Sequence, residues 1–231
     1  MKVDLHKYLS DRLHKGEKSF KEAGPVITLS RQYGCPAKNI AKKLSEELTR
    51  KMEIRGNKEI QWKYVTKEIM SESAKELKVD PSKIKYVFDY KQKGIIDDIL
   101  SAQLNKYYKS DRKIRNTIAR VIRNMAYFGH VIIVGRGGVA ITRDIPRSLH
   151  INLEAPLDWR VLRIAEKENL SFEEAEKTII DIDKKRKQFR EYFEGKNTDY
   201  TWFDITFDCM TMSIDEIVKI ILKAVEVRNF Y

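Results

Sequence analysis

Short, almost continuous apolar runs recur along this 231-residue chain and are separated by long segments with helical spacing. The runs are VITLS at 26–30, VIIVG at 131–135 and LHINLE at 149–154. Such runs are typical of strands that are buried on both faces, as in a parallel sheet covered by helices on each side. FDITFDC at 203–209 predicts a further strand. The chain is therefore predicted to be an α/β protein built on a parallel sheet.

Apolar residues at every fourth position predict two long helices whose apolar stripes face the core. The stripes are Ile40, Leu44, Leu48 and Met52 in the first helix, and Ile114, Ile118, Ile122 and, one position off, Met125 in the second.

Local chemistry marks three further helix starts. Ser171 with Glu174 and Ser213 with Glu216 have the spacing of capping boxes, in which each side chain satisfies an amide of the first turn. Asp80-Pro81 opens another helix, because proline at the first helical position forfeits no hydrogen bond.

The block from about 55 to 110 is polar and helical in pattern, and it interrupts the alternation of strands and helices. It is either a separate subdomain laid over the sheet edge or a long helical excursion packed on the core, and we favour the subdomain. A chain of this length can hold one α/β domain with such an addition.

The charge balance indicates anionic partners. The chain has 45 Lys and Arg against 34 Asp and Glu, a formal net charge of +11. Nucleotides, nucleic acid and acidic surfaces all fit this charge, which alone does not choose among them.

Cys35 and Cys209 are far apart in sequence and show no CxxC or Cys/His metal spacing, so neither a disulfide framework nor a zinc site is indicated. Beside a helix start, Cys35 would have a lowered thiol pKa if the dipole pointed at it, although a packing role is favoured. The first 20 residues alternate charges, and the longest apolar runs are too short to span a bilayer. A soluble cytoplasmic protein with no membrane partner is expected.

The stretch VITLSRQYGCPAKNIAKKLSEEL at 26–48 passes from a strand through a bend into a helix. Such a connection presents backbone N–H groups and the positive end of a helix dipole, which suits a phosphate. Compared with the motif GxxxxGK[ST], Gly34 and Lys38 remain, Pro36 removes one amide donor, and Asn39 stands near the expected hydroxyl. An ordinary strand–turn–helix connection with a solvated lysine is the open alternative.

Two arginine-bearing segments are further candidates for anion binding. VIIVGRGG puts Arg136 between glycines at the carboxyl edge of a buried strand, where ligands bind in open α/β folds. IDKKRKQFREYF at 182–193 puts Arg186 and Arg190 four residues apart on one helical face, so both could clamp one polyphosphate. Solvated arginines are the alternative for each, and nucleic acid is the competing partner of the basic helix.

Taken together, four segments resemble the cytidylate kinase-like family over 26–228: ITLSRQYG with a helix-opening lysine, VIIVGRGG, APLDWRVLRIAEKENLSFEEAEKTIIDIDKKR and MSIDEIVKIILKAV. The resemblance implies a three-layer P-loop NTPase fold with a five-stranded parallel sheet, a helical insert and an arginine-bearing lid. It implies a single domain with a core at about 24–54 and 111–231, a nucleotide- or acceptor-binding insert at about 55–110 and a lid at about 171–200.

The resemblance also assigns roles to individual residues. Gly34, Lys38 and Asn39 would bind the nucleotide, with Lys38 near the donor phosphates. Arg115 and Arg136 would bind the acceptor phosphate. Lys38, Arg186 and Arg190 would be catalytic, with both arginines closing over the phosphates.

Several positions depart from the family pattern. The loop reads GCPAKN where the family commonly reads GSGGRE, Val134 and Gly137 replace carboxylates of the true cytidylate kinases, and Asp183 replaces a third lid arginine. No protein ligand for a metal is therefore assigned. Mg²⁺ is expected to be coordinated mainly by the phosphates of ATP.

These observations favour transfer of the γ-phosphoryl group of ATP to a nucleoside monophosphate or a related small acceptor. The expected partners are a nucleotide and a small anionic acceptor. A non-catalytic nucleotide or anion sensor with a degenerate loop is the alternative, and a nucleic-acid binder is less favoured. The sequence does not give the oligomeric state.

Overall fold

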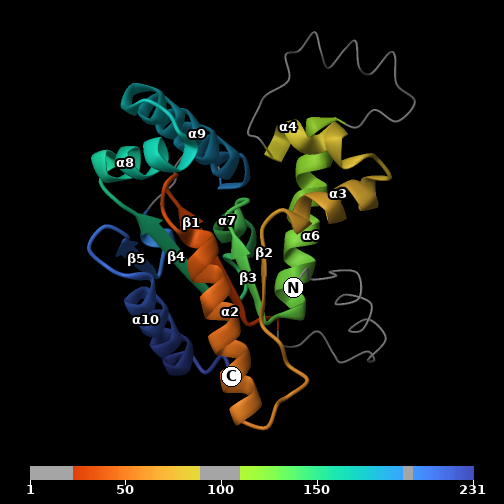
Figure 1. Cartoon of the computed structure of the whole chain (residues 1–231). Coiled ribbons are helices and arrows are strands. Elements are labelled where there is room, and N and C mark those ends of the chain that lie inside the picture. Colours follow the sequence, from red (N-terminus) through yellow and green to blue (C-terminus); the bar gives the residue numbers. More distant parts are fainter. Residues whose placement is uncertain (1–22, 89–109, 195–199) are drawn as a thin grey trace.

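The computed structural model describes residues 23–88, 110–194 and 200–231, which form a five-stranded sheet with helices on both sides (Figure 1). The strands are β1 (Val26–Arg31), β2 (Lys63–Val65), β3 (Val131–Val134), β4 (Ser148–Glu154) and β5 (Ile205–Asp208). Their spatial order is β2-β3-β1-β4-β5, and every neighbouring pair is parallel. All four strands predicted from apolar runs are present, which confirms the parallel α/β architecture.

Strand β2 lies inside the 55–110 block, which the sequence pattern predicted to be helical. Lys63–Val65 pairs with β3 at the edge of the sheet. Within this strand only Val65 is buried, so it lacks the apolar run that marks the other strands. The helical prediction is therefore wrong for 63–65, which belongs to the core sheet.

The helical part of the block begins after β2. It contains α3 (Glu68–Leu77), the 3-10 helix η1 (Pro81–Ile84) and α4 (Lys85–Phe88), and α3 packs against α6 (Asp111–Phe128). Residues 89–109 of the predicted insert lie outside the described residues.

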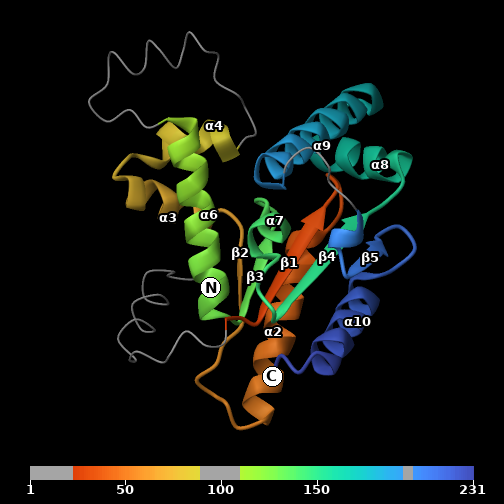
Figure 2. The same ribbon diagram turned by 180° about the vertical axis from the view of Figure 1, so that it is seen from behind.

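Two helical layers cover the sheet (Figures 1 and 2). One face is covered by α2 (Ala37–Ile54) and α10 (Ile214–Val227), and the other by α6 and α7 (Gly138–Thr142). The predicted apolar stripes of α2 and α6 are buried in these two interfaces. The three-layer fold implied by the family resemblance is confirmed.

The helices α8 (Leu157–Glu168) and α9 (Phe172–Glu194) lie together beyond the carboxyl ends of β1 and β4 (Figures 1 and 2). The second 3-10 helix, η2 (Tyr200–Trp202), precedes β5. Residues 195–199 of the predicted lid are outside the described ranges.

The predicted helix starts are present, with one difference. Ser171 Oγ accepts the N–H of Glu174 at 3.3 Å, and Ser213 forms the second capping box with Glu216. Asp80 accepts the N–H of Ser82 at 2.8 Å, but the helix that begins at Pro81 is a 3-10 helix before it continues as α4.

In the part of the chain that the structure describes, no helix is both long enough and apolar enough to cross a lipid bilayer.

Candidate functional site

The candidate phosphate loop has the predicted strand–turn–helix path. Strand β1 ends at Arg31, the chain turns at Gly34 with φ +99°, and α2 begins at Ala37. A Cβ at position 34 would lie 3.0 Å from Cβ of Arg160. Glycine is therefore required at position 34 for two reasons, its positive φ and the close approach of α8.

The amides of this loop are mostly engaged within the protein. Gln32 N–H donates to the Leu153 carbonyl at 2.9 Å, continuing the β1–β4 ladder. Tyr33 N–H donates to Asp183 Oδ1 at 2.7 Å. Cys35 N–H donates to the Gln32 carbonyl at 3.3 Å.

Ala37 N–H donates to the Cys35 carbonyl at 2.9 Å, and Pro36 has no N–H to offer. The N–H of Gly34 has no acceptor among the residues that the structure describes. The expectation that the loop presents a row of amides to a phosphate is thus corrected, because the turn and Asp183 already supply acceptors to most of them.

Asp183 and Arg160 connect α9 to this loop. The Arg160 side chain is buried, and its Nη1 lies 2.6 Å from Asp183 Oδ2. It also donates to two backbone carbonyls, through Nε to Ala155 at 2.9 Å and through Nη1 to Tyr33 at 3.2 Å. One guanidinium therefore joins α8, the loop and α9, and its charge is matched by the carboxylate that accepts the Tyr33 amide.

Arginines from different elements gather beside the loop at the carboxyl edge of the sheet. Arg186 of α9 donates through Nη1 to the Arg31 carbonyl at 3.3 Å, and its guanidinium lies 5.2 Å from the centre of the Tyr33 ring. The Arg31 guanidinium crosses from the end of β1 to Gly135, where any Cβ would collide with it. Arg136 follows with a positive φ of 59°, directly after β3.

Arg186 and Arg190 have different partners, although the sequence predicted that both clamp one polyphosphate. Arg190 Nε lies 3.3 Å from Glu194 Oε2, and its guanidinium lies 5.9 Å from the Phe203 ring. Arg186 instead donates to the Arg31 carbonyl and lies 3.6 Å from Asp183 Oδ1. The two arginines are one turn apart, but their guanidinium groups have different partners.

The Arg115 guanidinium packs against aromatic side chains of α9. Its guanidinium lies 4.7 Å from the Tyr192 ring and 5.4 Å from the Phe189 ring. A Cβ at Gly137 would lie 3.1 Å from the Phe193 ring. The second half of α9 therefore packs over the segment that follows β3, and it brings Arg115 of α6 to the same side of the sheet.

Lys38 and Asn39 are exposed on the first turn of α2. Within the described ranges, the Lys38 side chain has neither a hydrogen bond nor an ion pair. The structure thus brings Arg31, Arg186 and the segment with Arg136 together, and it leaves Lys38 on the adjoining surface.

Glu194, at the end of α9, is a buried carboxylate. Its side chain is 1% exposed and faces Arg190. Burial raises the pKa of Glu194 to about 7, while Arg190 and Arg143 lower it. This carboxyl group is therefore half-protonated near neutral pH.

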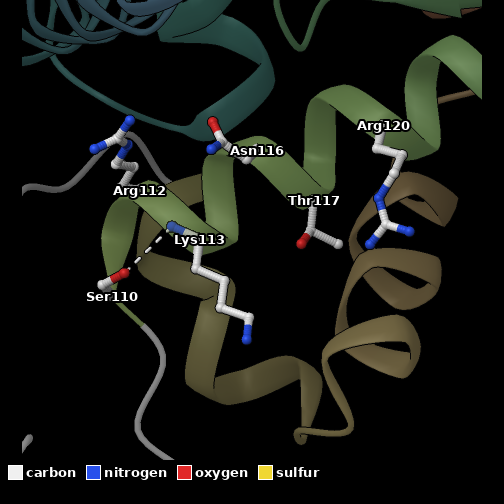
Figure 3. A pocket seen from close by; sticks show the side chains of 6 residues that line it. All are labelled: Ser110, Arg112, Lys113, Asn116, Thr117 and Arg120. Carbon is white, nitrogen blue, oxygen red and sulfur yellow. Dashed lines mark hydrogen bonds between the residues drawn. The ribbon is translucent and has the colours of Figure 1, made fainter.

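A shallow hollow of about 460 Å³ lies on α6, where the helix faces the α3–α4 segment (Figure 3). Its lining residues are Ser110, Arg112, Lys113, Asn116, Thr117 and Arg120. Arg120 forms an ion pair with Glu76 of α3. This hollow is separate from the arginines at the sheet edge, because none of those arginines lines it.

No group of three or more His, Cys, Asp or Glu side chains in the described ranges is arranged to hold a metal ion. The site is cationic, and the chemistry it suits is the binding of polyanions.

The strand order and the strand–turn–helix connection after β1 define an α/β protein with the three-layer fold of P-loop NTPases. The family profile of the cytidylate kinase-like family matches residues 26–211, and the chain belongs to that family.

Curated relatives include two archaeal proteins described as cytidylate kinase. The one from Methanocaldococcus jannaschii is 24% identical over 127 residues, which are 54% of this chain and 71% of that protein. The one from Methanopyrus kandleri is 28% identical over 134 residues, 54% of this chain and 69% of that protein.

Solved structures share the fold at low identity. An uncharacterized protein from Eubacterium ventriosum has a TM-score of 0.61 at 20% identity, with 87% of this chain and 98% of that chain covered. Shikimate kinase from Bacteroides thetaiotaomicron has a TM-score of 0.50 at 13% identity, with the same coverage. At these identities the likeness concerns the fold alone.

Sequence reasoning did not assign Arg31 and Arg160 to the site, and it treated Asp183 only as a departure from the family. Arg31 and Arg160 stand in the quoted segments ITLSRQYG and APLDWRVLR. A basic residue at the end of a predicted strand was an available signal for Arg31. The pairing of Arg160 with Asp183 depends on how α8 and α9 pack, which the sequence pattern does not give.

Proposed function

We propose that the chain binds a nucleoside triphosphate at the carboxyl edge of the sheet and transfers its γ-phosphoryl group to a nucleoside monophosphate or a related small anionic acceptor. Membership of the cytidylate kinase-like family supports kinase chemistry in general. A cytoplasmic location, expected from the cysteine usage, is part of this proposal.

The observation that carries the proposal is the gathering of arginines beside the loop. Arg31 comes from β1 and Arg186 from α9, and Arg136 follows β3, where the Arg31 guanidinium meets Gly135. Phosphoryl transfer needs little from a protein except positioning and neutralisation of charge on the phosphates. A cationic edge built from three elements supplies both.

Each residue then has a role in the transfer. Arg31 and Arg186 bind the transferred phosphoryl group, and Lys38 contacts the donor phosphates from the start of α2. Arg115 and Arg136 hold the acceptor phosphate. An oxygen of that phosphate attacks the γ-phosphorus as the bond to the β-phosphate oxygen breaks, and the nucleoside diphosphate leaves.

Arg190 takes part only after a change of partner, whereas Asn39 and Gly34 do not need one. Arg190 reaches the phosphates when it exchanges its contact with Glu194 for a phosphate oxygen. Asn39 and the N–H of Gly34 lie where the loop meets α2 and complete the donor side. Mg²⁺ that enters with the nucleotide would be coordinated by the nucleotide phosphates and by water, because the described residues offer it no carboxylate cluster.

The test is product analysis with the full chain. The protein is incubated with MgATP and, in turn, CMP, UMP, AMP and GMP, and the nucleoside diphosphates are measured by chromatography. One acceptor should yield a diphosphate in equal amount to ADP. Arg186→Ala should slow this reaction by roughly 10²-fold or more, as expected for a cation that stabilises the transition state.

The matched control is Arg50→Ala. Arg50 lies near the end of α2 that is opposite the loop, in a surface ion pair 2.6 Å from Glu47. Its replacement should leave the rate unchanged. The absence of any diphosphate product at saturating ATP would overturn the transfer reaction.

A second candidate, an ATP- or anion-binding sensor without transfer, is favoured by one observation. The amides of Tyr33, Cys35 and Ala37 donate within the protein, so the loop offers few of them to a phosphate. A sensor predicts saturable nucleotide binding with no product for any acceptor, which the same incubation measures.

A further inference from the structure

The two cysteines of the chain meet next to the candidate phosphate loop, although they are far apart in sequence. Cys35 lies in the loop between β1 and α2, and Cys209 directly follows β5. Cys35 packs against the core cluster that contains Cys209, and their thiols are hydrogen bonded. Both cysteines are free thiols in this structure.

The sheet explains why these cysteines meet. Strand β4 lies between β1 and β5, and both connections bend over its carboxyl end. Cys209 N–H donates to the Glu154 carbonyl at 2.8 Å, and Ala155 N–H donates to Gln32 Oε1 at 3.0 Å. The end of β4 therefore fixes the backbone on both sides of the pair.

The two thiols differ in a way that suits stepwise oxidation. Cys35 is partly exposed, whereas Cys209 is 5% exposed. The hydrogen bond with Cys209 lowers the pKa of the Cys35 thiol, burial opposes this, and the nearby Arg160 charge favours the thiolate. The same hydrogen bond, followed by burial, raises the pKa of the Cys209 thiol. Cys35 is thus the attacking thiol, because the thiolate is the nucleophile.

We propose that Cys35 and Cys209 are a modification site at which a small disulfide oxidant, such as oxidised glutathione, forms a reversible intramolecular disulfide that locks the loop. The Cys35 thiolate attacks the oxidant and releases one molecule of its thiol, leaving a mixed disulfide. Cys209 then loses its proton and attacks the Cys35 sulfur, and the second thiol leaves. Two protein thiols become one disulfide as one oxidant becomes two thiols.

The disulfide would hold the loop in the arrangement seen here. Bond formation would bring the two sulfur atoms from hydrogen-bond contact to about 2.05 Å. It would tie the loop to the β5–α10 connection and keep the Tyr33, Cys35 and Ala37 amides on their internal acceptors. Bond formation does not depend on the proposed function, whereas the effect on nucleotide binding rests on it.

The chemical test uses the folded full chain and oxidised glutathione, followed by intact mass and peptide mapping without reduction. The expected product has lost two hydrogen atoms and yields one cross-linked peptide pair that contains positions 35 and 209. Cys209→Ser should instead accumulate a glutathione adduct on Cys35. A wild-type chain that carries the adduct without the cross-link, or that cross-links only when unfolded, would overturn the site.

The functional test compares ATP affinity in the reduced, oxidised and re-reduced wild-type protein by titration calorimetry. Oxidation should weaken binding by roughly tenfold or more, and reduction should restore it. Equal affinity in all three states would overturn the locking effect but not the disulfide. A reduced protein that binds no ATP would refute the proposed function, and the peptide map would still decide the disulfide.

Discussion

Arg31 occupies a position that only a glycine neighbour permits. Its guanidinium lies where a Cβ of residue 135 would be, and Gly135 itself has φ +71°. Arg31 also provides the carbonyl that Arg186 contacts at 3.3 Å. Gly135 therefore makes room for the Arg31 guanidinium, and the backbone of Arg31 helps to place Arg186.

Replacing Gly135 with alanine should displace the Arg31 guanidinium and weaken ATP binding by roughly tenfold, besides destabilising the fold by about 1 kcal/mol through backbone strain. Calorimetric titration and urea unfolding measure the two effects. Gly56→Ala is the matched control, because Gly56 has a similar φ of +85° with open space around it. The control should be destabilised to a similar extent and bind ATP normally; equal loss of affinity in both variants would contradict the role given to Arg31.

The Arg160–Asp183 pair makes a second prediction at this scale. Asp183→Ala leaves the Arg160 guanidinium buried without its carboxylate, so the free energy of unfolding should fall by about 3 kcal/mol. Asp181→Ala is the control, because Asp181 lies on the same helix in an exposed pair with Lys185. Its effect should stay within about 0.5 kcal/mol. Similar losses for the two variants in urea unfolding would show that the buried pair contributes no more than a surface pair.

At the scale of elements, α9 is the helix that connects the separate parts of the site. Its first half packs on α8, its middle contacts the loop through Asp183 and Arg186, and its last turns pack on the segment after β3 through Phe189 and Phe193. Its last residue, Glu194, is buried. One of the groups that hold α9 in place is therefore a carboxyl group whose pKa is raised to about 7.

Glu194 makes the stability of this packing depend on pH. Because burial raises the pKa of Glu194 from its ordinary 4.5 to about 7, the folded state binds the proton more tightly than the unfolded state. The stabilising contribution of protonated Glu194 should be fully present below pH 4.5. The free energy of unfolding should then fall by about 3 kcal/mol as the pH rises through 7. Glu194→Gln should remove this decline. Thermal unfolding of the wild type and of Glu194→Gln between pH 5 and 8 tests this prediction. If the stability of both proteins falls equally with pH, Glu194 is not the cause of the decline.

The sequence predicts helices and strands well where apolar residues recur in a regular pattern. It predicts poorly where an element is short, or where contacting residues are distant in sequence. Strands β1, β3 and β4 were found because their apolar runs are buried on both faces. Strand β5 was found from its apolar residues although it is an edge strand in which only Phe207 is buried. Strand β2 was missed because it is a three-residue edge strand. The contact of Asp183 with the Tyr33 amide joins segments 150 residues apart, so no local pattern could predict it.

At the scale of the whole molecule, the proposed reaction needs two phosphate-binding areas that act together. The donor area lies beside the loop at Arg31 and Arg186, and the acceptor area is assigned to Arg115 and Arg136. Arg115 comes from α6 and meets the aromatic side chains of α9. Helix α9 thus contacts both areas, and one linked ligand can occupy both at once only when they form one continuous site.

A bisubstrate ligand tests this arrangement directly. A compound in which two nucleosides are joined through five phosphates should bind roughly 10²-fold more tightly than ATP, because its second half binds at high effective concentration. Arg115→Ala should abolish this advantage and leave ATP affinity unchanged. Arg50→Ala should change neither value, since Arg50 lies in a surface ion pair with Glu47 near the end of α2 that is opposite the loop. Both ligands are titrated calorimetrically into all three proteins. If the wild-type chain binds the joined ligand no more tightly than ATP, the two areas are not one site, and a sensor with a single nucleotide site becomes the better description.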